Sequence, residues 1–232
     1  MEVDKQTIDI LANLAKNNKG LLFMPGNVLM NKPESEASSP IIRVDFASVT
    51  FPKESAVYDL TKLLSILNMF SSPNLEFDDK QLLVSDGEKR KASIRCAARN
   101  MISAPDYSKG RPTFDQDVQF SLSDSDFKML MKAVGAFSTP EISISGDGEH
   151  LKITTWDSKN SSNDKFEIIV GEASQTFTVI IDAVNLSIML PRTYTVTLTF
   201  RGLIQFESAN EHNTITYWIA ASEKSKVPVK GG

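Results

Sequence analysis

Cysteine is nearly absent from this chain of 232 residues, and so is any long apolar run. The single cysteine, Cys96, excludes a disulfide within the chain and is typical of proteins in a reducing compartment. The most apolar stretch, 177–190, is interrupted by Asp182 and Asn185 and is too short to cross a bilayer. The sequence therefore predicts no membrane partner and no disulfide framework.

An apolar secretory signal is also lacking, because Asp4, Lys5 and Asp9 occupy the positions where one would begin. The content of hydrophobic residues is 41% and that of charged residues is 23%, as in ordinary soluble globular proteins. The length allows one large domain or two ordinary ones. We expect a soluble protein of the cytoplasm.

Motifs for catalysis or metal binding are missing as well. No segment resembles a phosphate-binding loop, a zinc-ligand spacing or a nucleophile elbow, and the acidic turn at 146–149 lacks the further ligands of a calcium loop. His150 and His212 each lie beside an expected turn, with no partner that would position them for catalysis. The sequence predicts no catalytic residue, no metal and no cofactor, and hence a protein that is not an enzyme.

A repeated pattern is present instead. Apolar residues recur at helical spacing in four segments, at 4–19, 59–70, 122–137 and 182–190. Each segment leads into a pair of extended stretches around a turn, and the last three also follow an extended stretch. The expected hairpin turns are Pro25-Gly26-Asn27, Asp78-Asp79, Gly146-Asp147-Gly148 and Arg201-Gly202. The repeated unit is strand, helix, strand, strand.

This repetition predicts an α+β fold with two similar domains, each with two helices packed on antiparallel β-sheet. We expect an N-terminal domain at 1–107 and a C-terminal domain at 108–232, joined by a polar connector at about 103–117. The stretch 31–40, rich in Ser, Glu and Pro, is expected to be a mobile loop.

Lysines recur on the helix sides that face away from the apolar stripes, although the formal net charge of the chain is −4. The fourth segment offers only Asn185 and Ser187 there, and the other three contribute Lys5, Lys16, Lys19, Lys62, Lys128 and Lys132. Any one exposed lysine is most simply a solvated residue. A basic face repeated on an acidic chain, however, suits a regular polyanion that is held through its phosphates without base readout.

Three longer stretches resemble segments of a known protein family. They are "DKQTIDILANLAKNNKG" at 4–20, "AVYDLTKLLSILNMF" at 56–70 and "IDAVNLSIMLPRTYTVTLTF" at 181–200. In spacing and scattered identities, the chain resembles the DNA sliding clamps of T-even-type bacteriophages, which are similar in architecture to proliferating cell nuclear antigen (PCNA). The resemblance covers almost the whole chain.

The resemblance implies a closed head-to-tail ring, a homotrimer, whose helices line a hole and point their lysines at duplex DNA. Such a clamp tethers the replicative DNA polymerase and confers processivity, is opened by a clamp loader ATPase, and has no hydrolytic activity. It works in the cytoplasm of the infected bacterial host. Partners dock short apolar peptides near the domain junction, which in this chain indicates the neighbourhood of 103–117.

Two alternatives remain open. A non-catalytic β-rich binding or structural assembly module of a phage explains the strands but not the repeated lysines. An enzyme with a dispersed site is supported by no group of residues. The mass in solution separates the first alternative from the clamp, because a trimer of a 25.6 kDa chain favours the clamp.

Overall fold

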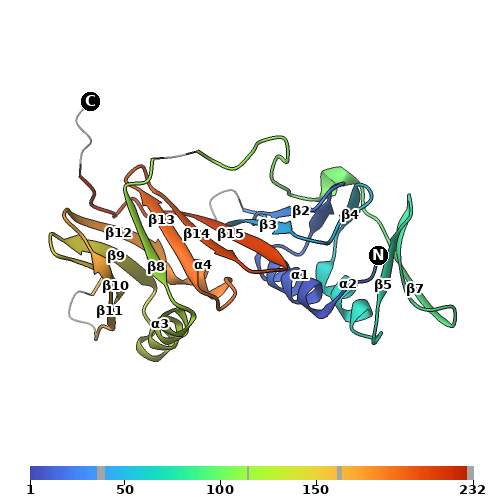
Figure 1. Ribbon diagram of the computed structural model, residues 1–232, viewed down its shortest axis with the longest axis horizontal. Helices are drawn as coiled ribbons and strands as arrows, with labels where there is room; N and C mark the ends of the chain where they lie inside the picture. Colours follow the sequence, from blue (N-terminus) through green and yellow to red (C-terminus); the bar gives the residue numbers. More distant parts are fainter. Residues whose placement is uncertain (36–39, 114, 161–163, 229–232) are drawn as a thin grey trace. The chain divides into compact units, whose positions relative to one another are not determined.

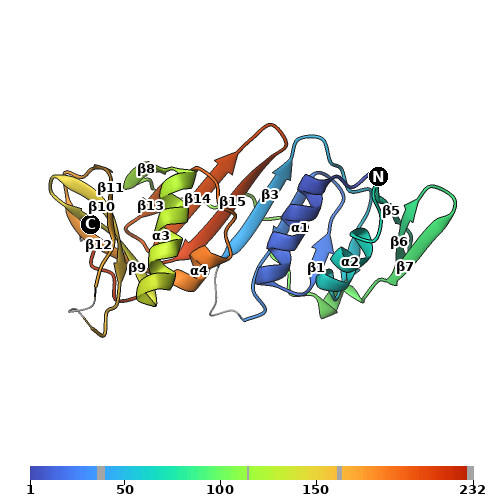
Figure 2. The same cartoon turned by 90° about the horizontal axis from the view of Figure 1, so that it is seen from below.

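The computed structural model describes residues 1–35, 40–113, 115–160 and 164–228. They divide into two compact units, the first formed by Met1–Gly110 with Ala209–Ile215 and the second by Arg111–Ser208 with the residues from Thr216 onward. In each unit, helices lie against β-strands, as Figures 1 and 2 show. The expected loop at 31–40 falls partly outside the described residues. The boundaries 1–107 and 108–232 for independent clamp domains stay a prediction.

Within the described residues the chain forms four α-helices, at the four segments that the sequence predicts. They are α1 (Lys5–Asn17), α2 (Leu60–Leu67), α3 (Asp124–Phe137) and α4 (Ala183–Ser187). Three begin at a side-chain cap: Asp4 accepts from the Thr7 N–H, Asp59 from Lys62 and Ser123 from Asp126, over 2.7–3.1 Å. Such caps satisfy N–H groups that have no partner within the helix, which explains where these helices start.

The strands of the first unit pair antiparallel. They are β1 (Leu21–Phe23) with β4 (Ser55–Val57), β2 (Val28–Asn31) with β3 (Ile41–Phe46), and β5 (Asn74–Phe77), β6 (Gln81–Asp86) and β7 (Arg90–Arg95) in one sheet. A short 3₁₀ helix, Arg99–Met101, follows β7. The turn at Asp78-Asp79 joins β5 to β6, as predicted.

The predicted hairpin around Pro25-Gly26-Asn27 is wrong, because β1 and β2 belong to different sheets. Gly26 has a positive φ of 114° and exchanges two backbone hydrogen bonds with Phe51, at 3.0 and 2.7 Å. The turn therefore passes the chain from one sheet to the next instead of folding it back on itself.

The second unit has antiparallel sheets as well. Its strands include β8 (Val118–Leu122), β9 (Glu141–Asp147), β10 (His150–Trp156), β11 (Glu167–Glu172), β12 (Thr176–Asp182), β13 (Tyr194–Thr199) and β14 (Leu203–Ala209). Among the described residues, β15 (Asn213–Ala220) is the last strand. One sheet has the order β11-β10-β9-β12, and β13 pairs with β8 and β14. The hairpins at 146–148 and 201–202 are present as predicted, whereas β11 and β15 are strands that the sequence pattern does not predict.

Each unit has its own aromatic core. In the first, the rings of Phe23, Phe46, Phe51 and Phe77 pack with centroids 5.2–6.3 Å apart. In the second, Tyr194 contacts Phe127, Phe206 and Tyr217 at 5.6–6.1 Å. Buried rings in tilted or edge-to-face contact contribute strongly to such cores. Through Phe127, the second of these cores holds α3 against β13.

The apolar stripe predicted for α3 is only partly buried. Phe127 and Leu130 are buried, but Phe137, the last residue of the helix, is 40% exposed. Ser138 ends the helix in the left-handed region, with φ of 53°. The end of α3 therefore lies at the margin of the core.

Candidate nucleic-acid interface

Helix α1 presents two of the expected lysines to solvent. Lys5 and Lys16 are both exposed, and their separation corresponds to about three helical turns, which places them on one side of the helix. Asp9 is exposed on the same side and partly offsets their charge. The opposite side buries Ile10 and Leu14 completely. The amphipathic pattern of α1 therefore leaves a mainly basic outer face.

Lys19 is exposed too, but it does not lie on α1 as predicted, because the helix ends at Asn17. The Asn18 side chain accepts from the Gly20 N–H at 2.8 Å and donates to the Lys32 and Ser103 carbonyls, which turns the chain out of the helix. The carbonyl of Lys19 then accepts from the N–H of Leu60 at 2.7 Å. The structure thus places Lys19 at the start of α2, the helix that carries Lys62.

Helix α2 packs beside α1 in the first unit (Figure 2). Lys62 is exposed in its first turn, next to Thr61 and one turn before Ser65, which are also exposed. On the other side of the helix, Leu60 and Leu63 are buried. The two neighbouring helices of the first unit therefore both carry exposed lysines.

Helix α3 carries Lys128 and Lys132, and both are exposed. Lys128 forms an ion pair with Asp124 at 2.5 Å, one turn earlier on the helix. Lys132 makes no ion pair with any residue that the structure describes. The two lysines thus differ in how much of their charge is free for a ligand.

The outer face of helix α4 lacks one of the polar residues that the sequence predicts. Asn185 is only 7% exposed, so its predicted place on the outer side is wrong. Ser187 is exposed but donates to the carbonyl of Val184 at 2.6 Å, and the Val184 side chain is 64% exposed. A helix of five residues is too short for a projection to fix its faces reliably. That the six lysines line one channel stays a prediction.

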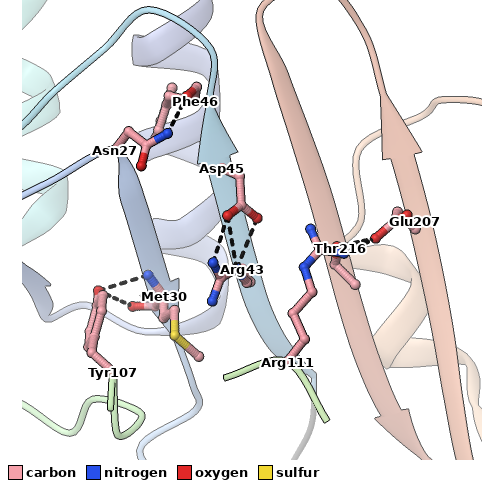
Figure 3. A network of polar contacts seen from close by, with 9 residues as sticks. All are labelled: Asn27, Met30, Arg43, Asp45, Phe46, Tyr107, Arg111, Glu207 and Thr216. Carbon is pink, nitrogen blue, oxygen red and sulfur yellow. Dashed lines mark hydrogen bonds and ion pairs between the residues drawn. The ribbon is translucent and has the colours of Figure 1, made fainter. Parts of the chain in front are cut away.

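The connector carries an anchor that the sequence pattern does not predict. The Tyr107 hydroxyl accepts from the Met30 N–H at 2.8 Å and lies 2.9 and 3.1 Å from the carbonyls of Leu22 and Met30 (Figure 3). Burial raises the pKa of Tyr107 to about 12, so the hydroxyl stays protonated and able to donate. The one signal for this anchor in the sequence is a lone aromatic residue in the polar stretch 103–110.

Further polar contacts are visible in the same view. In the first unit, the Arg43 guanidinium binds the Asp45 carboxylate, with the shortest contact at 2.7 Å (Figure 3). In the second unit, Arg111 pairs with Glu207, which also accepts from the Thr216 hydroxyl at 3.1 Å. The contact of Arg111 holds the first residue of the second unit, whereas the Arg43–Asp45 pair lies within β3.

The described part of the chain holds no group of three or more His, Cys, Asp or Glu side chains that could bind a metal. His150 is the first residue of β10 and His212 lies just before β15, 3.8 and 3.0 Å from the carboxylates of the preceding glutamates. Burial raises the pKa of the Cys96 thiol, which disfavours the reactive thiolate. Among the helices that the structure describes, none has the length and apolar character needed to span a membrane.

Solved structures of other proteins have the same fold as this chain. The chain superimposes on PCNA from Entamoeba histolytica with a TM-score of 0.71 and 14% identity, over 93% of this chain and 94% of that one. PCNA from A. fulgidus, solved with the C-terminal region of FEN-1 bound, gives a TM-score of 0.70 and 12% identity over 94% and 96%. The chain therefore has the clamp fold of PCNA, as the sequence predicts.

The sequence itself is similar to a phage protein. It is 29% identical over 176 residues to the sliding clamp of Vibrio phage KVP40. The matched residues cover 75% of this chain and 78% of that protein. No family model matches the chain. The resemblance to phage sliding clamps is thus confirmed by a relative that shares most of the length.

Proposed function

We propose that this protein is a DNA sliding clamp that encircles duplex DNA and tethers a replicative DNA polymerase, conferring processivity. The observation that carries the proposal is the PCNA fold in a chain that is similar to a phage sliding clamp. Exposed lysines on α1, α2 and α3 of an acidic chain support it further. The fold supplies the ring-forming scaffold, and the lysines supply the face toward DNA.

The proposed DNA contact is electrostatic and transient. Long ammonium side chains can exchange phosphate partners while DNA moves, and phosphate contacts carry no sequence information. Lys5, Lys16, Lys19 and Lys62 in the first unit, and Lys128 and Lys132 in the second, are the residues that we assign to this role. Because the ring would retain DNA by enclosing it, the direct affinity can be weak.

Partners follow from the same proposal. We expect a homotrimeric ring, opened by a clamp loader ATPase, that acts without a cofactor and without catalysis of its own in the cytoplasm of an infected bacterium. Two solved relatives support assembly and peptide docking as uses of this fold, namely the complex of PCNA2 with PCNA3 from Sulfolobus tokodaii and the bound C-terminal region of FEN-1 on A. fulgidus PCNA.

The decisive experiment loads the protein with its phage clamp loader and ATP onto a nicked circular plasmid and onto the same plasmid after linearisation. A topological clamp stays on the circle at a salt concentration that releases ordinary phosphate contacts, and slides off the linear form. Equal retention on both forms overturns the proposal. In that case, the alternative of a β-rich structural module gains support, and its mark would be a monomer or open polymer by sedimentation.

A further inference from the structure

A hollow in the surface of the first unit lies where α1 ends and α2 begins. The residues around it include Asn18, Lys19, Glu34, Tyr58, Met101 and Ile102. Two of them are large side chains in contact with solvent, since Tyr58 is 63% exposed and Met101 is 58% exposed. Large apolar side chains that are exposed together and have polar residues around them mark a candidate binding surface.

The backbone holds Tyr58 firmly although its ring is exposed. The residue before it, Val57, is buried at the end of β4 and pairs with Leu21 of β1. The residue after it, Asp59, caps α2, and the N–H of Leu60 then donates to the carbonyl of Lys19 at 2.7 Å. The ring is therefore presented to solvent on a fixed backbone, so a ligand that covers it does not have to order the chain first.

Unpaired positive charge surrounds the ring. Lys19 lines this hollow and also a neighbouring one that Lys16 lines, and Lys62 follows in the first turn of α2. None of these lysines forms an ion pair with a residue that the structure describes. Two carboxylates lie close by, but Glu34 is outnumbered and Asp59 already accepts from the N–H of Lys62 at 2.9 Å. The surroundings of the ring are therefore mainly basic.

An exposed aromatic ring beside free ammonium groups has the chemistry of a site for single-stranded nucleic acid. A base stacks on the ring, and the phosphates next to that base contact the lysines. Within a duplex the faces of the bases are covered by their neighbours, so only an unpaired base can stack on Tyr58. An apolar peptide could also cover Tyr58 and Met101, but it would leave the charge of the lysines unused.

We propose that Tyr58, together with Lys19 and Lys62, forms a stacking site for an unpaired nucleotide of a DNA strand. The inference rests on the proposed clamp function and deepens it, because the same lysines belong to the face that we assign to duplex DNA. Tyr58 adds a contact that duplex DNA cannot make. Stacking is tolerant of sequence, so the site fits any single-stranded stretch that adjoins the enclosed duplex.

The test measures the affinity of the full chain for labelled oligothymidylate of about twelve nucleotides and for a duplex of the same length, by fluorescence anisotropy at low salt. Tyr58→Leu should weaken binding of oligothymidylate by about fivefold to a hundredfold and should leave duplex binding unchanged. Tyr58→Phe keeps the ring and should bind as the wild type does. Lys19→Ala should weaken binding of both ligands, because both have phosphates.

Phe137→Leu is the matched control, since it removes another exposed aromatic ring, and it should leave both affinities unchanged. The assignment is overturned if folded Tyr58→Leu, checked by circular dichroism, binds oligothymidylate as tightly as the wild type does. It is also overturned if this variant loses duplex binding to the same extent, or if a short peptide rich in Leu and Phe binds at Tyr58 and oligothymidylate does not.

The proposed function is tested separately, by retention on circular DNA. A protein that stacks oligothymidylate through Tyr58 but leaves circular and linear plasmids equally fast contradicts the clamp function and not this site. A protein that stays on the circle while Tyr58→Leu has no effect on oligothymidylate contradicts this site and not the clamp function.

Discussion

The Lys128 ammonium lies 2.5 Å from the carboxylate of Asp124, one turn earlier on α3. Asp124 is in the first turn of the helix, where a negative charge is favoured by the helix dipole. The ion pair with Asp124 therefore occupies the Lys128 ammonium. Lys132, one turn later, has no ion pair among the described residues, so its charge is the freer of the two.

This difference predicts unequal effects of the two lysines on DNA. Lys132→Ala should lower clamp-dependent processivity more than Lys128→Ala, and the reduction should grow with salt because the remaining lysines are screened. The log–log salt slope of DNA binding should shrink by up to about 0.9 for each phosphate that a lysine no longer neutralises. Both changes are at exposed positions and should alter the free energy of unfolding by about 0.5 kcal/mol or less.

Glutamate at both positions should be worse than alanine, since it adds repulsion toward phosphate. Lys159→Glu, at an exposed loop position, serves as the control for net charge. Full processivity of the double glutamate variant across a salt series would show that these lysines are only a solvated face.

Tyr107 provides a second prediction. Tyr107→Phe removes a hydroxyl that contacts the backbone of β1 and β2, so the N–H of Met30 loses its acceptor. We expect the free energy of unfolding to fall by about 1–3 kcal/mol, the cost of leaving a partly buried polar group without a partner. Urea denaturation at neutral pH measures this change, and an unchanged midpoint would contradict it.

The same residue has a pH signature. Burial raises the folded-state pKa of Tyr107 to about 12, whereas an unfolded tyrosine titrates near about 10. Its stabilising contribution is complete below about pH 10 and is lost as the pH rises from there toward the folded value. Stability of the Tyr107→Phe variant should therefore fall less steeply than that of the wild type over this alkaline range. An equal decrease in stability with pH in both proteins would mean that Tyr107 does not contribute to the pH dependence of stability.

Much of the fold could be predicted because the signals are local. The start of α3 follows from Ser123 and its apolar spacing, and the β9-β10 hairpin follows from Gly146-Asp147-Gly148. The prediction of the first hairpin is wrong because two strands joined by a tight turn need not share a sheet, and only long-range pairing with Phe51 decides this. Strand β15 is buried along most of its length, so it lacks the alternation that marks a half-exposed strand.

The candidate interface was predictable in composition but not in detail. Five of the six lysines lie on helices as expected, since amphipathic spacing fixes which side faces solvent. Lys19 departs because Asn18 ends α1 through side-chain hydrogen bonds that depend on Lys32 and Ser103, which are distant in sequence. The pairing of Lys128 with Asp124 is local, and its spacing of four residues is visible in the sequence.

Two glycines offer opposite expectations for alanine. A Cβ at Gly146 on β9 would lie 2.4 Å from the Gln175 carbonyl oxygen and 2.7 Å from the Phe177 ring, so Gly146→Ala should destabilise the protein by about 1–3 kcal/mol. A Cβ at Gly135 on α3 meets nothing within 4 Å, so Gly135→Ala should stabilise it by about 0.5–1 kcal/mol. Thermal unfolding of the two variants side by side tests both. A stabilised Gly146→Ala variant would contradict the packing around Gly146, and a destabilised Gly135→Ala variant would contradict the open space at Gly135.

The segment 221–228 follows β15, and its Lys226 exchanges backbone hydrogen bonds with Thr178 on β12. A buried carboxylate, that of Glu141, also holds this segment. Glu141 is 7% exposed by its side chain and accepts from Lys224 at 2.6 Å, while the Ser158 hydroxyl and N–H donate to the same carboxylate at 3.1 and 2.9 Å. Burial alone would raise the pKa of Glu141, but the hydrogen bonds from Lys224 and Ser158 outweigh it and hold the pKa below its ordinary value. The carboxylate is therefore ionised at neutral pH and needs its cation.

Lys224→Ala should lower the free energy of unfolding by about 1–2 kcal/mol at neutral pH, less than for a fully buried pair because Lys224 is 50% exposed. Lys226→Ala is the matched control, since the backbone and not the side chain of Lys226 pairs with Thr178, and it should change stability by about 0.5 kcal/mol or less.

In the wild type, the contribution of Glu141 to stability is present above its ordinary pKa and is lost as the pH falls through the lowered value. In Lys224→Ala, the pKa of Glu141 should be higher than in the wild type because the cation is lost, and protonation then relieves the unpaired charge. The stability difference between wild type and Lys224→Ala should thus narrow as the pH falls below about 5, and a gap that widens in acid would show that Lys224 does not stabilise this carboxylate.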